Sequence, residues 1–250
     1  MRFYQMQLLE GRVLFAGVVA DGVLTVTGTT GNDEISLSVD PGAGPGFEDI
    51  VVTLNGVAEE FDLSGISRVI ILGREGRDVI DCTVTILAPL LLPVAVDAGT
   101  GNDIIRCGPN DDRIDAGAGD DSVWGNGGRD KIFGNDGEDY LNGGAQSDTM
   151  DGGTGNDRLN GNGGHDRLFG GPNVDRLFGY DGNDVLEGGS SNDRLEGGLG
   201  IDSMYGHGGN DRFFSFGDGA VDLLFGGEGD DSARVDVADS LSSIQTVVFS

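Results

Sequence analysis

Gly152-Gly153-Thr154-Gly155-Asn156-Asp157-Arg158-Leu159-Asn160 is one of thirteen nine-residue units that follow one another without a gap. The sixth position is aspartate in every unit: Asp103, Asp112, Asp121, Asp130, Asp139, Asp148, Asp157, Asp166, Asp175, Asp184, Asp193, Asp202 and Asp211. The eighth position is apolar in every unit: Ile105, Ile114, Val123, Ile132, Leu141, Met150, Leu159, Leu168, Leu177, Leu186, Leu195, Met204 and Phe213. Ser215 and Phe216 are inserted after the last unit, and the pattern then resumes with Asp222/Leu224 and Asp231/Ala233.

The composition limits the kinds of protein that this chain can be. Glycine makes up 47 of the 250 residues, but it does not recur at every third position and there are only 6 prolines, so a collagen helix is excluded. The net charge of -28 argues against nucleic acid and anionic membranes as partners and favours cations. A disordered acidic tail would not need an apolar residue at every ninth position. No apolar run approaches the length of a membrane span.

The nine-residue period predicts an all-β solenoid. Positions six to nine form a short strand with one inward side chain, and positions one to five form a glycine-rich turn. Two units then complete one coil, so that two parallel sheets face each other and coils stack at about 4.8 Å. The expected fold is a parallel β-roll, a right-handed β-helix solenoid with two strands in each coil.

This arrangement stacks the aspartates in two rows, because alternate turns lie on the same side. Carboxylates about 5 Å apart repel one another strongly without a counter-charge. Turn carbonyls point into the same space, and an oxygen-only site with flexible geometry suits Ca²⁺ better than Zn²⁺ or Cu²⁺. We therefore predict several bound calcium ions, with the thirteen aspartates, Asp222 and Asp231 as ligands.

The pattern G-G-x-G-x-D-x-U-x resembles the hemolysin-type (RTX, repeats-in-toxin) calcium-binding repeat. Close copies are Gly152–Asn160, Gly197–Tyr205 and Gly226–Arg234, and the resemblance covers residues 98–234. It implies a parallel β-roll with calcium in the turns, in which the aspartate side chain and carbonyls of the stacked neighbour bind the ion. It also implies export from a bacterium, usually by a type I system.

Five units lack glycine at the fourth position. They carry Asn110, Gln146, Asn173, Ser191 and Ala220 there. Asparagine tolerates a left-handed backbone better than other non-glycine residues. We therefore expect Gln146, Ser191 and Ala220 to weaken the neighbouring sites.

The domain organisation is predicted from changes in this pattern. Residues 1–20 are a leader of uncertain role, either a first strand with its flanks or a secretory signal. Residues 21–97 repeat the aspartate motif at Asp33 and Asp78, which predicts irregular coils continuous with the array, one of them lacking the aspartate; a separate small β-sandwich is the alternative. Residues 98–234 are the nonapeptide β-roll. Residues 235–250 are either a capping strand or a C-terminal export signal.

Three further groups of residues stand out. Cys82 and Cys107 each follow a motif aspartate by four positions, so they stack either as a disulfide or as two buried thiols. Arginines recur at position seven and aromatic residues at position nine, which indicates charge balance and cross-strand stacking, or else a surface that binds an acidic polysaccharide or mediates adhesion. His165 and His207 lie at variable turn positions and are interpreted as turn residues.

The predicted function is that of a secreted, non-enzymatic calcium-binding β-roll, a structural or secretion-coupled module that folds when calcium binds. Its partners are calcium ions, with the secretion machinery or a surface glycan as further partners, and the oligomeric state is left open. One alternative is a polysaccharide-acting enzyme of the lyase or epimerase kind. Another is a cell-surface adhesin.

Overall fold

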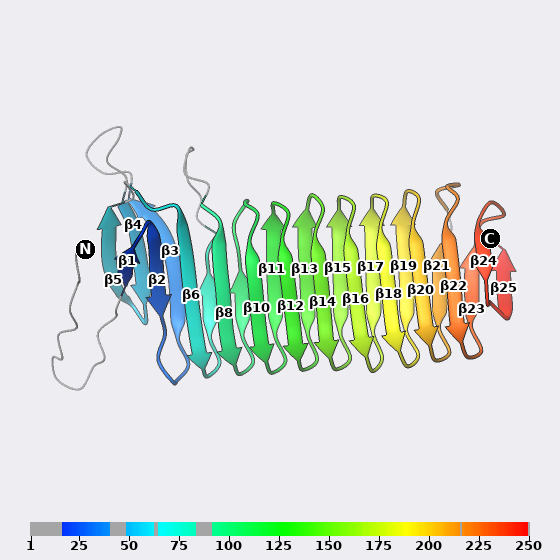
Figure 1. Ribbon diagram of the computed structural model, residues 1–250, viewed down its shortest axis with the longest axis horizontal. Coiled ribbons are helices and arrows are strands. Elements are labelled where there is room, and N and C mark those ends of the chain that lie inside the picture. Colours follow the sequence, from blue (N-terminus) through cyan, green and yellow to red (C-terminus); the bar gives the residue numbers. More distant parts are fainter. Residues whose placement is uncertain (1–16, 41–48, 63–64, 84–91, 216, 250) are drawn as a thin grey trace.

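The computed structural model describes residues 17–40, 49–62, 65–83, 92–215 and 217–249 (Figure 1). The structure is a long stack of β-coils, with the N-terminal coils at one end of the long axis and the C-terminus at the other. The described residues contain no helix, and so none that is long and apolar enough to cross a membrane.

Two large sheets run the length of the stack. The 12-stranded sheet contains, in spatial order, β1(Val18–Ala20), β2(Val23–Thr27), β6(Arg68–Glu75), β8(Val94–Thr100), β10(Arg113–Ala118), β12(Lys131–Asp136), β14(Thr149–Thr154), β16(Arg167–Pro172), β18(Val185–Ser190), β20(Ser203–Gly208), β22(Leu223–Glu228) and β24(Ser240–Ser242). The 13-stranded sheet contains β25(Thr246–Phe249), β23(Ser232–Val235), β21(Arg212–Ser215), β19(Arg194–Leu199), β17(Arg176–Asp181), β15(Arg158–Gly163), β13(Tyr140–Ala145), β11(Ser122–Gly127), β9(Ile104–Arg106), β7(Val79–Asp81), β3(Glu34–Asp40), β4(Asp49–Leu54) and β5(Val57–Asp62).

Consecutive strands of the array alternate between the sheets, and each pairs in parallel with the strand two further along. Leu159 pairs with Leu177, and Leu177 pairs with Leu195, so one coil takes eighteen residues. The predicted parallel β-roll is confirmed.

The strands are longer and the turns shorter than the sequence pattern indicated. β15 spans positions seven to nine of one unit and one to three of the next, which leaves Gly164 to Asp166 as the turn. Each strand therefore directs two positions inward. The eighth position supplies the apolar core, and the first position, which is buried as well, is usually glycine.

The N-terminal coils join the array without a break in either sheet. β2 pairs in parallel with β6 and β6 with β8, while β3 pairs with β7 and β7 with β9. The expectation of a coil between Asp33 and Asp78 is wrong, because Glu34 lies directly beside Val79. The residues between these motifs instead add β4 and β5 as antiparallel strands at the sheet edge.

The two-residue insertion does not interrupt the stack. Ser203 pairs with Leu223 and Arg212 with Ser232, so this coil takes twenty residues and the sheets continue. The tail then supplies the last strand of each sheet, with β24 beside β22 and β25 beside β23. Its alternative role as an export signal stays a prediction.

Candidate metal centre

The turns are built on a left-handed backbone at positions two and four of the unit. In the turn before Asp157, Gly153 has φ 96° and Gly155 has φ 136°. A Cβ on Gly155 would also collide with the carbonyl oxygen of Gly137 on the preceding coil, so only glycine fits without strain. Such a turn brings its peptide groups close to the turn stacked on it.

Three of the five non-glycine fourth positions adopt the backbone of the glycine turns, and the expected weakening of the neighbouring sites stays a prediction. Gln146, Asn173 and Ser191 adopt the left-handed conformation, with φ of 76°, 80° and 93°. Their turns therefore keep the shape of the others at some cost in strain. Asn110 is not among the described residues with positive φ, and its side chain donates to the carbonyl of Leu92.

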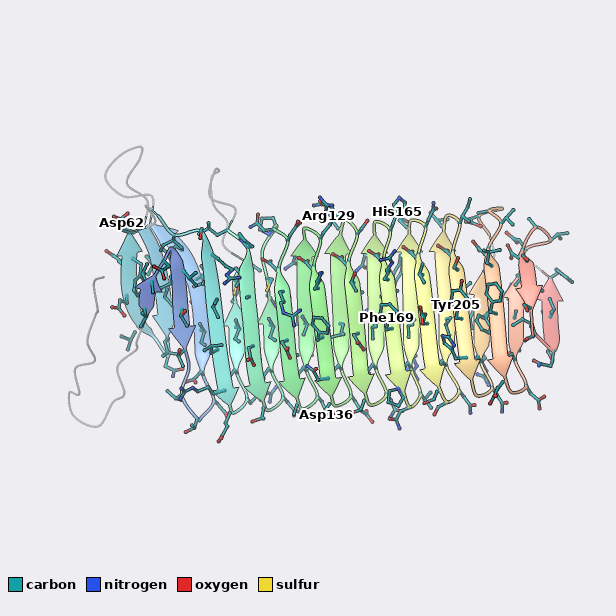
Figure 2. The ribbon with its side chains drawn as sticks, in the orientation of Figure 1. Asp62, Arg129, Asp136, His165, Phe169 and Tyr205 are labelled. Atoms are coloured by element: carbon teal, nitrogen blue, oxygen red, sulfur yellow. The ribbon has the colours of Figure 1, made fainter. Side chains whose placement is uncertain are left out.

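The sixth-position aspartates form two ladders along opposite long edges of the solenoid. Figure 2 shows these edges through Arg129 and His165, which precede Asp130 and Asp166, and through Asp136 at the end of β12, just before the turn that contains Asp139. In each ladder the amide of one aspartate donates to Oδ1 of the aspartate on the next coil, at 2.7–2.9 Å. The first ladder joins Asp33, Asp78, Asp103, Asp121, Asp139, Asp157, Asp175, Asp193, Asp211 and Asp231. The second joins Asp112, Asp130, Asp148, Asp166, Asp184, Asp202 and Asp222.

The second carboxylate oxygen has no hydrogen-bond partner in most of these aspartates, although it is buried. The atoms concerned are Oδ2 of Asp78, Asp103, Asp121, Asp130, Asp139, Asp148, Asp157, Asp166, Asp175, Asp184, Asp193, Asp202, Asp211 and Asp231. Buried polar atoms are nearly always paired, and an isolated buried carboxylate is especially unfavourable. A regular row of such atoms points to a ligand that supplies positive charge.

Most of these Oδ2 atoms lie beside a glycine at position one, and in the majority of turns a carbonyl of the next coil lies there as well; before Asp103 and Asp121 the first position is alanine. A Cβ placed on Gly152 would lie 2.5 Å from Oδ2 of Asp157 and 2.9 Å from the carbonyl oxygen of Gly170 on the next coil. The same two kinds of oxygen surround Gly134, Gly161, Gly170 and Gly179. Position one therefore leaves open the space on which a carboxylate and a carbonyl converge.

Burial shifts the acid–base behaviour of these carboxylates. Desolvation raises the pKa of Asp148 and of Asp175 to about 8, and that of Asp157 to about 6. The hydrogen bond to Oδ1 lowers each pKa in part, and neighbouring carboxylates raise it further. Positive charge in the turn would oppose both the desolvation and the repulsion.

The residues fit a hard divalent cation. Among the described residues, no three His, Cys, Asp or Glu side chains converge on one metal position, and the oxygens found near Oδ2 in turns such as that of Asp157 are backbone carbonyls. Carboxylate and carbonyl oxygens at variable geometry are the ligands that Ca²⁺ prefers, whereas Zn²⁺ favours sulfur and nitrogen.

Two predicted ligands differ from the rest. Oδ2 of Asp112 accepts a hydrogen bond from the amide of Gly108 at 3.3 Å, and Oδ2 of Asp222 accepts one from the hydroxyl of Ser215. Asp222 follows the insertion, and Ser215 belongs to that insertion. In both turns protein donors already satisfy the oxygen that elsewhere has no partner.

Sequence reasoning missed several members of the ladders. Asp33 and Asp78 extend the first ladder at its N-terminal end. At its other end the amide of Asp231 donates a hydrogen bond to Oε1 of Gln245. The second ladder ends at Asp239, which accepts a hydrogen bond from the amide of Asp222. The motif around Asp78 was visible in the sequence. Gln245 and Asp239 lie outside the nine-residue period, so no signal marked them.

Cys82 and Cys107 are buried free thiols on adjacent coils. The amide of Cys82 donates to the carbonyl of Arg106, and a hydrogen bond with Cys82 and burial raise the pKa of the Cys107 thiol well above its usual range. The disulfide stays a prediction. Intact-mass measurement after exposure to an oxidant tests it, because a disulfide lowers the mass of the chain by two hydrogen atoms.

The histidines have local roles. Nδ1 of His165 accepts from the amide of Asn183 on the next coil, at 2.8 Å. His207 has φ 72° at position two of its turn, and its Nε2 lies 3.3 Å from Glu187 Oε2. Both contacts join neighbouring coils.

Stacked parallel coils with a buried carboxylate in nearly every turn define a β-solenoid of the metal-binding kind. The profile of the RTX calcium-binding nonapeptide repeat matches residues 96–123, 108–141, 115–150, 142–177, 151–186, 169–204, 187–215 and 216–234. The chain belongs to this family and is a calcium-binding β-roll protein. Members of the family are typically secreted and structural. No curated protein matches the sequence.

Proposed function

We propose that this protein is a secreted, non-enzymatic calcium-binding β-roll whose folding is driven by Ca²⁺. The observation that carries the proposal is the row of buried Oδ2 atoms without partners, most of them beside a carbonyl of the next coil. Ions between the turns neutralise carboxylates that otherwise destabilise the stack.

Calcium affects folding because the complete site exists only when neighbouring coils are stacked. Oδ2 of Asp157 and the carbonyl of Gly170 belong to different coils, and a chain that has not stacked does not hold them together. Binding free energy then becomes folding free energy. The protein is therefore unfolded at the low calcium concentration inside a cell and folds outside it, which suits a module coupled to secretion.

Far-UV circular dichroism at pH 7.5 tests the proposal. We expect a disordered spectrum in excess chelator, a β-sheet spectrum in millimolar Ca²⁺, and little change in millimolar Mg²⁺, which demands a stricter geometry. Equal β-sheet content in chelator and in calcium would contradict the proposal.

A second candidate function is adhesion to an acidic polysaccharide through the outer face of the 13-stranded sheet. Arg158, Arg176, Arg194 and Arg212 lie side by side on neighbouring strands. They line a groove of about 910 Å³ together with Phe178, Asn192 and Asn210. Like charges in register destabilise a sheet, and guanidinium groups bind carboxylate or sulfate groups with two hydrogen bonds.

The opposite sheet provides the matched control. Arg167 there pairs with Thr149 and Val185, so it stands outside any such series. In calcium buffer, dextran sulfate should bind the protein while uncharged dextran does not. The pair Arg176→Gln and Arg212→Gln should weaken binding about tenfold or more, and Arg167→Gln should leave it unchanged. Equal weakening by Arg167→Gln would show general charge attraction and contradict a built site.

A further inference from the structure

The region before the matched repeats contains one turn with the same features as the interior of the array. Gly73-Arg74-Glu75-Gly76-Arg77-Asp78 leads from β6 into β7. Arg74 has φ 91° and Gly76 has φ 123°, so positions two and four are left-handed as they are in the nonapeptide turns. The family profile begins at residue 96, beyond this turn.

Asp78 has the full set of contacts of an interior ladder member. It is 0% exposed, its Oδ1 accepts from the amide of Asp33 at 2.8 Å, and its own amide donates to Asp103 at 2.7 Å. Its Oδ2 has no partner. A Cβ on Gly73 would collide with this Oδ2 and with the carbonyl of Ala98 on the next coil, so the two oxygens converge beside a glycine.

Asp33, one coil earlier, is equally buried but differently bound. Its Oδ2 accepts from the amide of Thr29 at 2.6 Å and from the Thr29 hydroxyl at 3.1 Å. Its Oδ1 accepts from the side-chain amide of Asn55 at 2.6 Å. Donors of the protein therefore satisfy both of its carboxylate oxygens.

We propose that Asp78 Oδ2 and the Ala98 carbonyl form a further divalent-cation site, the first of its row, and that Asp33 ends the row without an ion. The site rests on the proposed calcium binding and extends the ion array beyond the nonapeptide region. The two aspartates occupy the same place in the ladder, and only the hydrogen-bond donors around them differ.

Ion counting by native mass spectrometry tests the proposal on the full chain loaded with Ca²⁺. Asp78→Asn keeps an oxygen to accept from the amide of Asp33 but replaces Oδ2 by a neutral amide, and it should bind one ion fewer than the wild type. Asp33→Asn is the matched control and should bind as many as the wild type. An unchanged count in Asp78→Asn, or the same loss in both variants, would overturn the proposal.

Anomalous scattering keeps the test independent of how the variants fold. A crystal of the unmodified protein soaked in a lanthanide should show a peak between Asp78 and Ala98, and none beside Asp33. Peaks in the nonapeptide turns without one at Asp78 would refute this site alone. A chain that binds no ions in either experiment would refute the proposed function as well.

Discussion

The aspartates inside the two ladders and those at the ladder ends share a backbone arrangement but differ in what surrounds Oδ2. Inside, as at Asp157, this oxygen is buried and has no partner. At three of the four ends, protein donors reach it: Thr29 at Asp33, Gly108 at Asp112 and Ser215 at Asp222, whereas Asp231, the last aspartate of the first ladder, keeps an unpartnered Oδ2. The chain thus provides its own donors where a row begins or is broken by the insertion, and we propose that an external cation neutralises the interior carboxylates.

The comparison also explains the extreme glycine content of the array. Glycine at positions two and four allows the left-handed turn, and glycine at position one leaves space beside Oδ2. Hydrogen-bond donors that could enter the turn would compete with the ion. We propose that at neutral pH the interior turns need an ion for stability, whereas at Asp33, Asp112 and Asp222 the protein supplies its own donors.

The largest effect is expected from pH in the absence of calcium. The interior carboxylates have raised pKa values, up to about 8 at Asp148 and Asp175, because burial disfavours their charged form. The folded chain then holds more protons than the unfolded chain, so its stability is greatest at low pH and is lost as the pH rises through about 6 to 8. Circular dichroism in chelator should show β-sheet at pH 5 and its loss by pH 8.

Calcium should reverse that dependence, since the ion needs the deprotonated carboxylate. With calcium present, stability should hold through pH 8 and decline towards pH 5 as protons displace the ion. A calcium-free protein that is more stable at pH 8 than at pH 5 would contradict the picture of desolvated interior carboxylates.

A smaller effect is expected from removing one interior carboxylate. Asp157→Ala deletes the acceptor for the amide of Asp139 and the ion-binding oxygen, and should lower the free energy of unfolding in calcium by about 3–5 kcal/mol. Asp222→Asn, at an end turn, keeps an oxygen for the amide of Asp202 and should cost about 1 kcal/mol. Urea denaturation in millimolar calcium measures both. Similar losses of unfolding free energy in the two variants would contradict the distinction between interior aspartates and those at the ladder ends.

The glycine positions sharpen the comparison within a single turn. Gly155→Ala forces a left-handed alanine against the carbonyl of Gly137 and should destabilise the protein by about 2–3 kcal/mol. Gly163→Ala is the control, since the added Cβ would lie 3.9 Å from its nearest neighbour, the carbonyl oxygen of Gly144, and the φ of Gly163 is not positive. The free energy of unfolding of that variant should stay within about 1 kcal/mol of the wild-type value. Melting temperatures in calcium compare the two.

Much of this structure follows from the sequence period. The invariant eighth position gave the inward face, and the eighteen-residue coil then placed Asp139 beside Asp121 and Asp157. The inward first position was not predicted, because a buried glycine such as Gly152 carries no hydrophobic signal. The antiparallel strands β4 and β5 were missed because the spacing from Asp33 to Asp78 suits an extra coil as well as a hairpin.

The donors at the ladder ends were also beyond the sequence. Thr29, Gly108 and Ser215 come from three unrelated local arrangements, and only the folded turns bring them to a carboxylate. The sequence therefore predicted all fifteen aspartates as ligands and expected weaker sites only beside Gln146, Ser191 and Ala220, without foreseeing these donors. The structure separates Asp112 and Asp222 from the others, and it adds Asp78 to the set with a buried, unpartnered oxygen.

Calorimetric titration of the calcium-free chain with Ca²⁺ at pH 7.5, with circular dichroism read on the same samples, tests the central claim most directly. If the interior carboxylates need an ion in order to stack, heat and β-sheet signal should rise together over one narrow range of calcium and saturate at several ions per chain. A β-sheet signal that is complete before the heat develops, or saturation at a single ion, would contradict the account.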